Sequence, residues 1–432
     1  MLFRSGVCNG AGACALYGTS QVCDTTASCD SSNASVIVSK ACNGAGSCVP
    51  SSTFSCNGFV CSAGACGTSC SGDSECSSGR FCSATACFAS PVNLAGNGDL
   101  EYGAATGWSS FGGGGTLVLE NAGTSPTLVN SGTFAIADTA RAQNYQGPSY
   151  NLPTGAGQYV VSAWAMQNDN PTQTVALQIQ LTCKTSTSYP TIGMFGLLLS
   201  QGVWTHITGT VDFATQGTPA GDCQPTATTP GAVKSAVLYL NQTVAGAPVA
   251  LPNLFLDDVT VQVSDGHNLV GNPNFEANLT SGWQNNGGGV VGISTTNFKS
   301  GAMGLGVTGR LAPSNGPRWN LPLGAAKYNV VFNALHTGAQ VHDLVLQPTY
   351  TCLGGAGQYP AAIATAAALP KDTWTQLSGT VTLPPADAVA GCKLSSAAVY
   401  VQQGGGGTCG SGTGQVECPD LFIDDVSITL SP

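Results

Sequence analysis

The sequence predicts an all-β protein in which two β-sandwiches of jelly-roll type follow an irregular, disulfide-rich N-terminal segment. Three observations lead to this prediction. Thirteen of the 19 Cys residues lie between positions 8 and 87. The rest of the chain carries motifs that recur 167 to 175 residues apart. Within each copy, apolar residues alternate with polar ones over short runs broken by Gly, Pro, Asn and Thr, which is typical of antiparallel sandwiches.

The composition excludes several classes of protein. The chain of 432 residues has 12 Lys and Arg against 22 Asp and Glu, a net charge of −10. A nucleic-acid phosphate backbone is bound by clustered Lys and Arg, so we expect no nucleic-acid partner. No run of about 18 apolar residues is present, so we expect no membrane span. The oligomeric state is left open, with a monomer the expectation.

Residues 1–90 form the predicted cysteine-rich segment. The motif CNGAGAC (8–14) returns as CNGAGSC (42–48), and few large apolar residues accompany it. We therefore expect disulfides to hold this segment, which would serve as a spacer or stalk. A zinc site is the weaker alternative, because no His precedes His206 and no Cys-x2-Cys pair occurs. Disulfides persist in oxidising compartments, which predicts a secreted or cell-surface protein. The N-terminus lacks a signal peptide, so we expect that the natural start is missing.

The two sandwiches are expected at 91–264 and 265–432 because the sequence is duplicated. NLAGNGDLE (93–101) returns as NLVGNPNFE (268–276), and GPSYNLP (147–153) as GPRWNLP (316–322). LFLDDVTV (254–261) returns as LFIDDVSI (421–428). Val175, Leu177, Ile179 and Leu181 show the alternation of a strand. The Ala-rich run 361–369 aligns with 191–199, which favours a strand there as well.

Six cysteines outside the leader are predicted to be structural. Cys183 and Cys223 lie 40 residues apart, and Cys352 and Cys392 repeat that spacing. One spacing in two copies predicts a disulfide within each sandwich. Cys409 and Cys418 have no counterpart in the first copy and are expected to pin a Gly-rich insertion.

An acidic pair closes each copy. Asp258 falls on the same face of the predicted strand as the apolar residues Leu254 and Leu256. After Asp258 the apolar residues move to the other set of alternating positions. Asp425 stands in the same pattern in the second copy. An inward carboxylate needs a partner, and Ca²⁺ bound through oxygen ligands would supply one. Glu101 and Glu276 are the other acids common to both copies. The alternatives are a β-bulge that turns the acid towards solvent, or a different partner.

The ordered motifs resemble the CenC-type carbohydrate-binding module. The order is NLxxNxxFE, GW, an Arg followed by Gly-Pro, Wxx[LI]xG, an [LV]Y[LV] strand and a closing [FL]xDDV. The resemblance covers about 340 of the 432 residues. That family includes xylan- and β-glucan-binding modules of bacterial xylanases and glucanases. The resemblance implies a jelly roll with a glycan groove on its concave sheet and one structural Ca²⁺ per module. The leader is only broadly similar to cysteine-rich spacers of bacterial surface proteins.

The resemblance also implies site residues. The sugar-facing Arg falls on Arg141 and Arg310, and a stacking aromatic on Tyr145, where the second copy has Ser314. The family's aromatic residue on a late strand falls on Tyr239 in the first copy and on Tyr400 in the second. Two residues further along that strand, the family has an acid, which is replaced here by the amides Asn241 and Gln402. The implied carbohydrate-binding residues are Arg141, Tyr145, Tyr189, Tyr239, Asn241, Arg310, Tyr359, Tyr400 and Gln402. The implied calcium ligands are Glu101, Asp258, Glu276 and Asp425.

These residue types suit sugars, because aromatic rings cover the C–H face of a pyranose while Arg and amides bind its hydroxyls. For Tyr239 and Tyr400, a place in the core is an equal alternative. Trp164, which becomes Asn333 in the second copy, is a secondary ligand candidate. We expect packing roles for the following aromatic residues: Trp108, Tyr150, Trp204, Trp283, Trp319 and Trp374.

The predicted function is non-catalytic binding of a plant polysaccharide of the xylan or β-glucan class, which targets a larger secreted protein or glycoside hydrolase to its substrate. Catalysis needs a nucleophile or a positioned acid–base pair. The four His residues (206, 267, 336 and 342) are not duplicated, and the proposed calcium sites account for most of the acids shared by both copies. The alternative is a structural or adhesive surface protein whose sandwiches are spacers.

Overall fold

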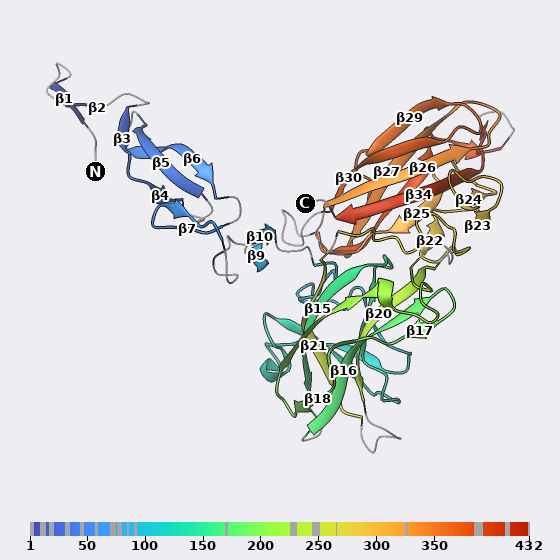
Figure 1. Cartoon of the computed structure of the whole chain (residues 1–432), viewed down its shortest axis with the longest axis horizontal. Helices are drawn as coiled ribbons and strands as arrows, with labels where there is room; N and C mark the ends of the chain where they lie inside the picture. Colours follow the sequence, from blue (N-terminus) through green and yellow to red (C-terminus); the bar gives the residue numbers. More distant parts are fainter. Residues whose placement is uncertain are drawn as a thin grey trace. The chain divides into compact units, whose positions relative to one another are not determined.

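The computed structural model describes the chain in two units, Met1–Pro91 and Val92–Pro432, each of which is considered by itself (Figure 1). No helix of the described residues is long and apolar enough to cross a membrane. The described residues are 4–8, 14–16, 21–30, 35–43, 47–56, 59–69, 75, 80–83, 86–89, 93–168, 172–224, 231–243, 251–264, 266–324, 327–383, 392–410 and 415–430.

The first unit contains more regular structure than the sequence predicts. Its central strand, β5 (Ser35–Cys42), pairs with β3 (Val22–Asp24), β4 (Ser28–Cys29) and β6 (Cys48–Ser55). The prediction of an irregular segment is therefore wrong for this part, where the β-branched run Val36–Val38 favours a strand. Three two-stranded pairs complete the unit: β1 (Arg4–Cys8) with β2 (Cys14–Leu16), β7 (Cys61–Ser62) with β8 (Ala65–Cys66), and β9 (Arg80–Ser83) with β10 (Ala86–Ala89).

Disulfides supply much of the packing in this unit, as expected for a segment with few large apolar side chains. Val36 packs with the cystine residues Cys56 and Cys61 in a small buried cluster. The bonded pairs among the described residues of this unit are Cys23–Cys48, Cys29–Cys61 and Cys56–Cys66. The two CNGAG loops lie partly outside the described residues.

The second unit contains two sandwiches of antiparallel sheets, which confirms the predicted fold class (Figure 1). In the first sandwich, a six-stranded sheet has the order β11-β14-β20-β16-β17, with β18 also paired to β16. A five-stranded sheet has the order β12-β13-β21-β15-β19. Two 3-10 turns, η2 (Pro126–Leu128) and η3 (Phe213–Thr215), accompany them. The strands are β11 (Trp108–Ser110), β12 (Thr116–Asn121), β13 (Phe134–Thr139), β14 (Pro148–Leu152), β15 (Gln158–Gln167), β16 (Thr172–Cys183), β17 (Thr187–Ser188), β18 (Thr191–Ser200), β19 (Thr205–Asp212), β20 (Val233–Gln242) and β21 (Leu254–Val263).

The second sandwich repeats this topology strand for strand. Its six-stranded sheet runs β22-β25-β31-β27-β28 with β29 on β27, and its five-stranded sheet runs β23-β24-β34-β26-β30. A short parallel pair, β32 with β33, lies in the insertion that the first copy lacks. The strands are β22 (Trp283–Asn285), β23 (Val290–Ser294), β24 (Gly304–Thr308), β25 (Pro317–Asn320), β26 (Lys327–His336), β27 (His342–Cys352), β28 (Gly357–Gln358), β29 (Ala364–Leu369), β30 (Thr375–Thr382), β31 (Leu394–Gln403), β32 (Thr408–Cys409), β33 (Gln415–Val416) and β34 (Leu421–Leu430).

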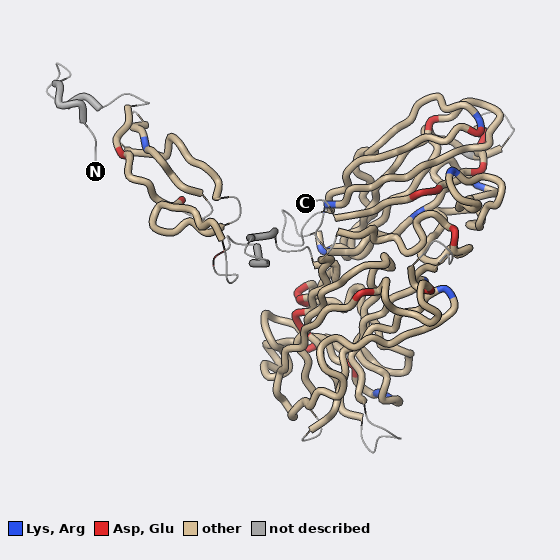
Figure 2. Tube along the Cα trace, viewed as in Figure 1, with Lys and Arg blue, Asp and Glu red and all other residues tan. Residues whose placement is uncertain are grey.

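Most buried apolar residues of both sandwiches join one cluster that extends from Leu94 to Ile428, and Ala137, Met166 and Phe255 form a smaller one. Trp108, Tyr150 and their second-copy equivalents, Trp283 and Trp319, are buried in it, as predicted. Charged side chains are sparse along both sandwiches (Figure 2). Apolar burial and the backbone ladders of the sheets therefore dominate the stability of this unit.

Disulfides tie the loops to the sheets. Cys183, at the end of β16, is bonded to Cys223, and Cys352, at the end of β27, to Cys392. Cys409 is bonded to Cys418 in the insertion of the second sandwich. These are the pairs that the spacing of the cysteines predicts.

The predicted inward register of Asp258 is wrong, because strand β21 contains a bulge at this point. The pairing with β15 shifts between Ser162 and Trp164, and Asp258 takes a positive φ of 48°. Asp257 is fully buried instead, and Asp258 is turned partly towards solvent. The bulge was the alternative that the flip in apolar phase left open. Asp425 repeats it with a φ of 46°.

The two sandwiches meet through matching loops. A Cβ atom on Gly155 would lie 2.0 Å from the carbonyl oxygen of Asn268, and one on Gly324 would lie 1.6 Å from that of Asn93. Only Gly tolerates so close an approach. Lys393 adds hydrogen bonds from Nζ to the carbonyl oxygens of Glu101 (3.3 Å) and Tyr102 (3.0 Å). Each opening motif thus packs against the other sandwich.

Candidate functional site

The outward face of each six-stranded sheet carries a row of polar and aromatic side chains. In the first sandwich, the row runs across β11, β14, β20 and β16 through the cross-strand neighbours Ser109, Ser149, Tyr239 and Gln178. The next residue along β14, Tyr150, belongs to the core. Because side chains alternate along a strand, the row points away from the core.

Hydrogen bonds connect the side chains at the centre of this row. The Tyr239 hydroxyl and Nδ2 of Asn241 both donate to Oε1 of Gln178, at 3.2 and 2.6 Å. Burial raises the pKa of Tyr239 to about 12, so its hydroxyl stays protonated at neutral pH. Oδ1 of Asn241 is buried without a hydrogen-bond partner. A ligand hydroxyl would satisfy this acceptor.

Aromatic rings continue from this row into a loop. Phe111 stacks on Tyr239, with ring centroids 3.9 Å apart. The ring of Tyr145 packs against Gly112, the residue that follows Phe111. A Cβ atom on Gly112 would lie 2.7 Å from the ring of Tyr145. Tyr145 is 45% exposed and Tyr189 is 52% exposed. The first sandwich therefore presents an aromatic surface beside the amides of Gln178 and Asn241.

The side chain of Arg141 is buried and does not face the surface, where the resemblance places a sugar-binding Arg. Its side chain is only 6% exposed, and its guanidinium donates to the backbone carbonyls of Asn144, Gln146 and Pro252 at 2.7–2.9 Å. Burial lowers the pKa of Arg141 to about 10, which leaves it charged at neutral pH. Arg141 thus lies under the loop that carries Tyr145 and positions that loop, instead of standing beside Tyr145 at the surface.

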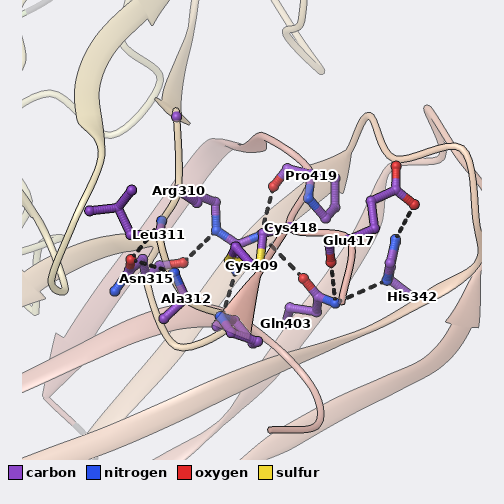
Figure 3. Close-up of a disulfide and its surroundings, with 12 residues drawn as sticks. Arg310, Leu311, Ala312, Asn315, His342, Gln403, Cys409, Glu417, Cys418 and Pro419 are labelled. Carbon is purple, nitrogen blue, oxygen red and sulfur yellow. Dashed lines mark hydrogen bonds and ion pairs between the residues drawn. A yellow bond between two sulfur atoms is a disulfide. The ribbon is translucent and has the colours of Figure 1, made fainter. Parts of the chain in front are cut away.

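Arg310 is held in the same way in the second sandwich (Figure 3). Its guanidinium donates to the carbonyl oxygens of Pro313 (2.5 Å), Asn315 (2.7 Å) and Pro419 (2.6 Å). Pro419 directly follows Cys418, whose disulfide fixes this part of the insertion. The guanidinium is therefore buried among backbone carbonyls, and the loop above it exposes Ser314 where the first copy has Tyr145.

The second sandwich has the equivalent row with different chemistry. Gln284, Arg318, Tyr400 and Gln347 are cross-strand neighbours on β22, β25, β31 and β27. Tyr400 is buried, and burial raises its pKa. Ser109 and Ser149 of the first row are thus replaced by a Gln and an Arg.

Two further predicted residues flank this second row. Tyr359 is 70% exposed, and Gln402 lies two residues beyond Tyr400 on the same strand. Gln347 Nε2 donates to the carbonyl oxygen of Pro360, the residue after Tyr359, at 2.6 Å. In the first sandwich, Gln178 makes the same kind of contact to the carbonyl oxygen of Tyr189 (3.4 Å). The two faces are therefore built alike around different side chains.

A cleft of about 350 Å³ adjoins the second row at the junction of the two sandwiches. Polar groups and small residues line much of it, with Arg318 among them. The lining residues are Gly107 and 150–153 from the first sandwich, and Gln284, Arg318, 320–323 and 395–397 from the second.

The predicted acids of the first copy both accept hydrogen bonds from one loop. Oε1 of Glu101 accepts hydrogen bonds from the backbone N–H groups of Thr133 (2.7 Å) and Phe134 (3.0 Å). Oδ1 of Asp258 accepts one from Oγ of Ser131 at 2.9 Å. The buried neighbour Asp257 accepts from the N–H groups at the start of this loop, and burial raises its pKa to about 7.

The second copy repeats this arrangement. Glu276 accepts from the N–H groups of Ala302 and Met303, both at 2.8 Å, and Asp425 from Oγ of Ser300 at 2.7 Å. Among the described residues, no group of three or more His, Cys, Asp or Glu side chains is placed so that it could hold a metal ion. A cation at either place would therefore be bound by two carboxylates together with backbone or hydroxyl oxygens.

Comparison with known families identifies the domains that carry these rows. Residues 92–223 and 267–395 match the family described as "Carbohydrate binding domain". The chain belongs to this family. Each sandwich is one carbohydrate-binding domain, and the row on its six-stranded sheet is the candidate sugar-binding face.

The chain is similar to endo-1,4-β-xylanase A of Thermoanaerobacterium saccharolyticum, to which it is 24% identical over 364 residues. The match covers 78% of this chain but spans only about a quarter (26%) of the xylanase. Among solved structures, the tandem CBM22-1–CBM22-2 domain of Paenibacillus barcinonensis Xyn10C is 16% identical, with a TM-score of 0.34, and the match covers 79% of this chain and 98% of that one. The C-terminal family 22 module of Clostridium thermocellum Xyn10B is 18% identical (TM-score 0.30), covering 37% and 90%.

The predicted carbohydrate-binding residues of the sheets and of the loops lie in different places. Tyr239, Asn241, Tyr400 and Gln402 lie on the central strands of the six-stranded sheets, whereas Arg141 and Arg310 are held beneath loops. Trp164 lies on the other sheet of its sandwich, near His206. The residues of the faces that were not predicted include Phe111, Gln178, Arg318 and Gln347. Gln178 and Gln347 occupy the same place in the duplicated strand, a signal that the sequence contains.

Proposed function

We propose that the two carbohydrate-binding domains bind xylan. The observation that carries this proposal is the run of rings from Tyr145 through Phe111 to Tyr239, beside the amides of Gln178 and Asn241. Aromatic rings cover the C–H face of a pyranose, and amides satisfy its hydroxyls. The match to a xylanase supports xylan as the polymer.

Binding is expected to be weak for each domain and stronger for the pair. A sugar ring that covers one aromatic face contributes roughly 1–2 kcal/mol at about 25 cal/mol per Å². After the cost of association, a few such contacts leave affinities in the micromolar to millimolar range. Two linked domains on one polymer raise the overall affinity through effective concentration. This supports a functional role for the duplication.

The same faces support binding without hydrolysis. Cleavage of a glycosidic bond usually requires two carboxylic side chains on opposite sides of the bond. The two rows of cross-strand neighbours contain Ser, Gln, Tyr and Arg and no carboxylate. In this proposal the domains act as accessory parts of a larger protein, such as a glycoside hydrolase, and hold it on its substrate.

We further propose that each domain binds one structural Ca²⁺. Glu101 and Asp258 would hold it in the first domain, and Glu276 and Asp425 in the second, with oxygens of the loop between them. Support comes from the residue types, because carboxylate and hydroxyl oxygens are ligands that Ca²⁺ prefers, and in each domain the Glu and the Asp contact one loop that carries a Ser hydroxyl. The cation would neutralise the paired acids and fix the loop.

The proposed location is outside the cell. Six disulfides join described residues of the chain. Disulfides persist in oxidising compartments and are rare in the cytosol. A polymer such as xylan is also met outside the cell, which agrees with this location.

Affinity electrophoresis of the full chain tests the main proposal. The protein is run in native gels that contain xylan, mixed-linkage β-glucan or no polymer, with Ca²⁺ present. We expect retardation in the xylan gel. Equal mobility in all three gels, for protein shown to be folded by circular dichroism, would contradict the proposal and favour the interpretation of the sandwiches as spacers.

A further inference from the structure

The faces of the two domains differ in charge at one position. Arg318 on β25 occupies the place of Ser149 on β14, directly beside the central tyrosine of its row. In the first domain, Ser149 is buried and exchanges a hydrogen bond with Ser109 at 2.9 Å. In the second, Arg318 is partly exposed and lines the cleft at the junction of the domains.

The guanidinium of Arg318 has few protein partners. Its one hydrogen bond among the described residues runs from Nη1 to Oδ1 of Asn286, at a long 3.4 Å. Its Nε is buried and has no acceptor. None of the ion pairs between described residues includes it. Arg318 differs in this from Arg310, whose Nε, Nη1 and Nη2 all donate to backbone carbonyls.

The surroundings of Arg318 suit a sugar residue. The cleft has a volume of about 350 Å³, within the range of roughly 300–1,000 Å³ that small-ligand pockets have. The amides of Gln284, Asn320 and Asn151 also line it. These groups donate to and accept from hydroxyls, while a guanidinium forms paired hydrogen bonds with a carboxylate.

The charge of the whole chain restricts what kind of acidic polymer fits. At a net charge of −10, the protein repels a chain that carries a carboxylate on every sugar. A neutral backbone with occasional acidic side groups avoids this repulsion and still offers one carboxylate to one guanidinium. A polymer of this kind would contact the aromatic face of the first domain through neutral sugars.

We propose that the cleft beside Arg318 binds the carboxylate of a uronic acid substituent on a neutral polysaccharide backbone, so that the pair of domains prefers uronate-bearing xylan to unsubstituted xylan. This inference rests on the proposed xylan binding. Arg318 binds the carboxylate, and the amides of Gln284 and Asn320 bind neighbouring hydroxyls.

Affinity electrophoresis with matched polymers tests the proposal. The full chain is run in gels of glucuronoxylan and of the same polymer after its carboxyl groups have been reduced to alcohols. The variants are Arg318→Gln, which removes the charge, and Arg318→Lys, which keeps it without the paired donors. We expect the wild type to bind glucuronoxylan about tenfold more tightly than the reduced polymer, as one charge-assisted contact allows.

The pattern of results separates this inference from the proposed function. Arg318→Gln should lose the preference, because its affinity falls more for glucuronoxylan than for the reduced polymer, and Arg318→Lys should keep part of the preference. In 0.5 M NaCl the preference of the wild type should shrink, because partly exposed charges are screened. Equal affinity of the wild type for both polymers, or an undiminished preference in Arg318→Gln, would overturn the inference while leaving xylan binding intact. Failure to bind either polymer would overturn both, and tighter binding to a sulfated xylan would reject the carboxylate.

Discussion

The ring of Phe111 lies flat against the ring of Tyr239, with centroids 3.9 Å apart and 11° between the planes. One face of Tyr239 is therefore covered by protein, and the residue is only 3% exposed. The exposed aromatic residues of the first domain include Tyr145 and Tyr189 instead, and Phe111 is partly exposed. Tyr239 supports Phe111 and holds Gln178 through its hydroxyl.

This relationship predicts unequal effects of two substitutions on xylan binding. Phe111→Ala should weaken binding by the first domain about tenfold, because a stacking contact contributes on the order of 1.5 kcal/mol. Tyr239→Phe should weaken it less than about threefold, since the stack remains and Gln178 keeps its bond from Asn241. Isothermal titration with xylo-oligosaccharides measures both. A larger loss in Tyr239→Phe than in Phe111→Ala would contradict the assignment.

The hydrogen bonds from Arg141 to three backbone carbonyls predict that replacing this residue lowers the stability of the first domain. Arg141→Met removes three hydrogen bonds from a buried charge to backbone carbonyls, and we expect it to cost about 3 kcal/mol. For a domain of this size, that corresponds to a fall of roughly 6–12 °C in Tm, measured by scanning calorimetry. Arg318→Gln is the matched control and should change Tm little. If Arg141→Met reduced xylan binding at an unchanged Tm, Arg141 would be a sugar ligand after all.

Removal of calcium should destabilise both domains. If Ca²⁺ binds the folded state alone, a hundredfold excess over its Kd stabilises by about 2.7 kcal/mol. We therefore expect EDTA to lower Tm by several degrees and CaCl2 to restore it. The double variant Glu101→Gln/Asp258→Asn should lose this response in the first domain, while Asp372→Asn, a change at an exposed acid, should keep it. An identical Tm with EDTA and with CaCl2 would rule out the structural calcium.

The Asp222 carboxylate predicts a pH dependence of stability. Burial would raise its pKa, but hydrogen bonds from the hydroxyls and N–H groups of Ser186 and Thr185 outweigh this and lower the pKa below its usual value. A lowered pKa stabilises the fold above the unfolded value, near 3.9, and this contribution is lost as pH falls through the folded pKa. Asp222→Asn should thus cost about 2 kcal/mol at pH 7 and progressively less below about pH 4. Urea unfolding at pH 7 and pH 3 measures the difference, and a gap between wild type and variant that widens in acid would contradict the assignment.

The sandwiches could be predicted because their signals are local and repeated. Val175, Leu177 and Ile179 alternate with polar residues, and the duplication marks two copies of one fold. The bulge at Asp258 could not be assigned, because a flip in apolar phase fits either an inward carboxylate or an extra residue in the strand. Only the pairing with β15 separates the two cases.

The binding residues were harder to predict because their roles depend on contacts between distant parts of the chain. Arg141 precedes an exposed tyrosine by four residues, which in sequence looks like a ligand pair. In the fold, the carbonyl of Pro252, 111 residues away, converges on its guanidinium. Arg318 was missed for the opposite reason: it lies in a motif where Trp319 is a core residue, and only the sheet register places it beside Tyr400.

Binding through the outward faces of the six-stranded sheets is the central claim, and the retardation of matched variants in xylan gels tests it most directly. The full chain is compared with Tyr145→Ala, Tyr359→Ala, the double variant, and Val290→Ala, a change at an exposed residue on the other sheet of the second sandwich. We predict that each tyrosine variant is retarded less than the wild type, the double variant least of all, and that Val290→Ala is retarded like the wild type. Full retardation of a folded double variant would contradict the claim.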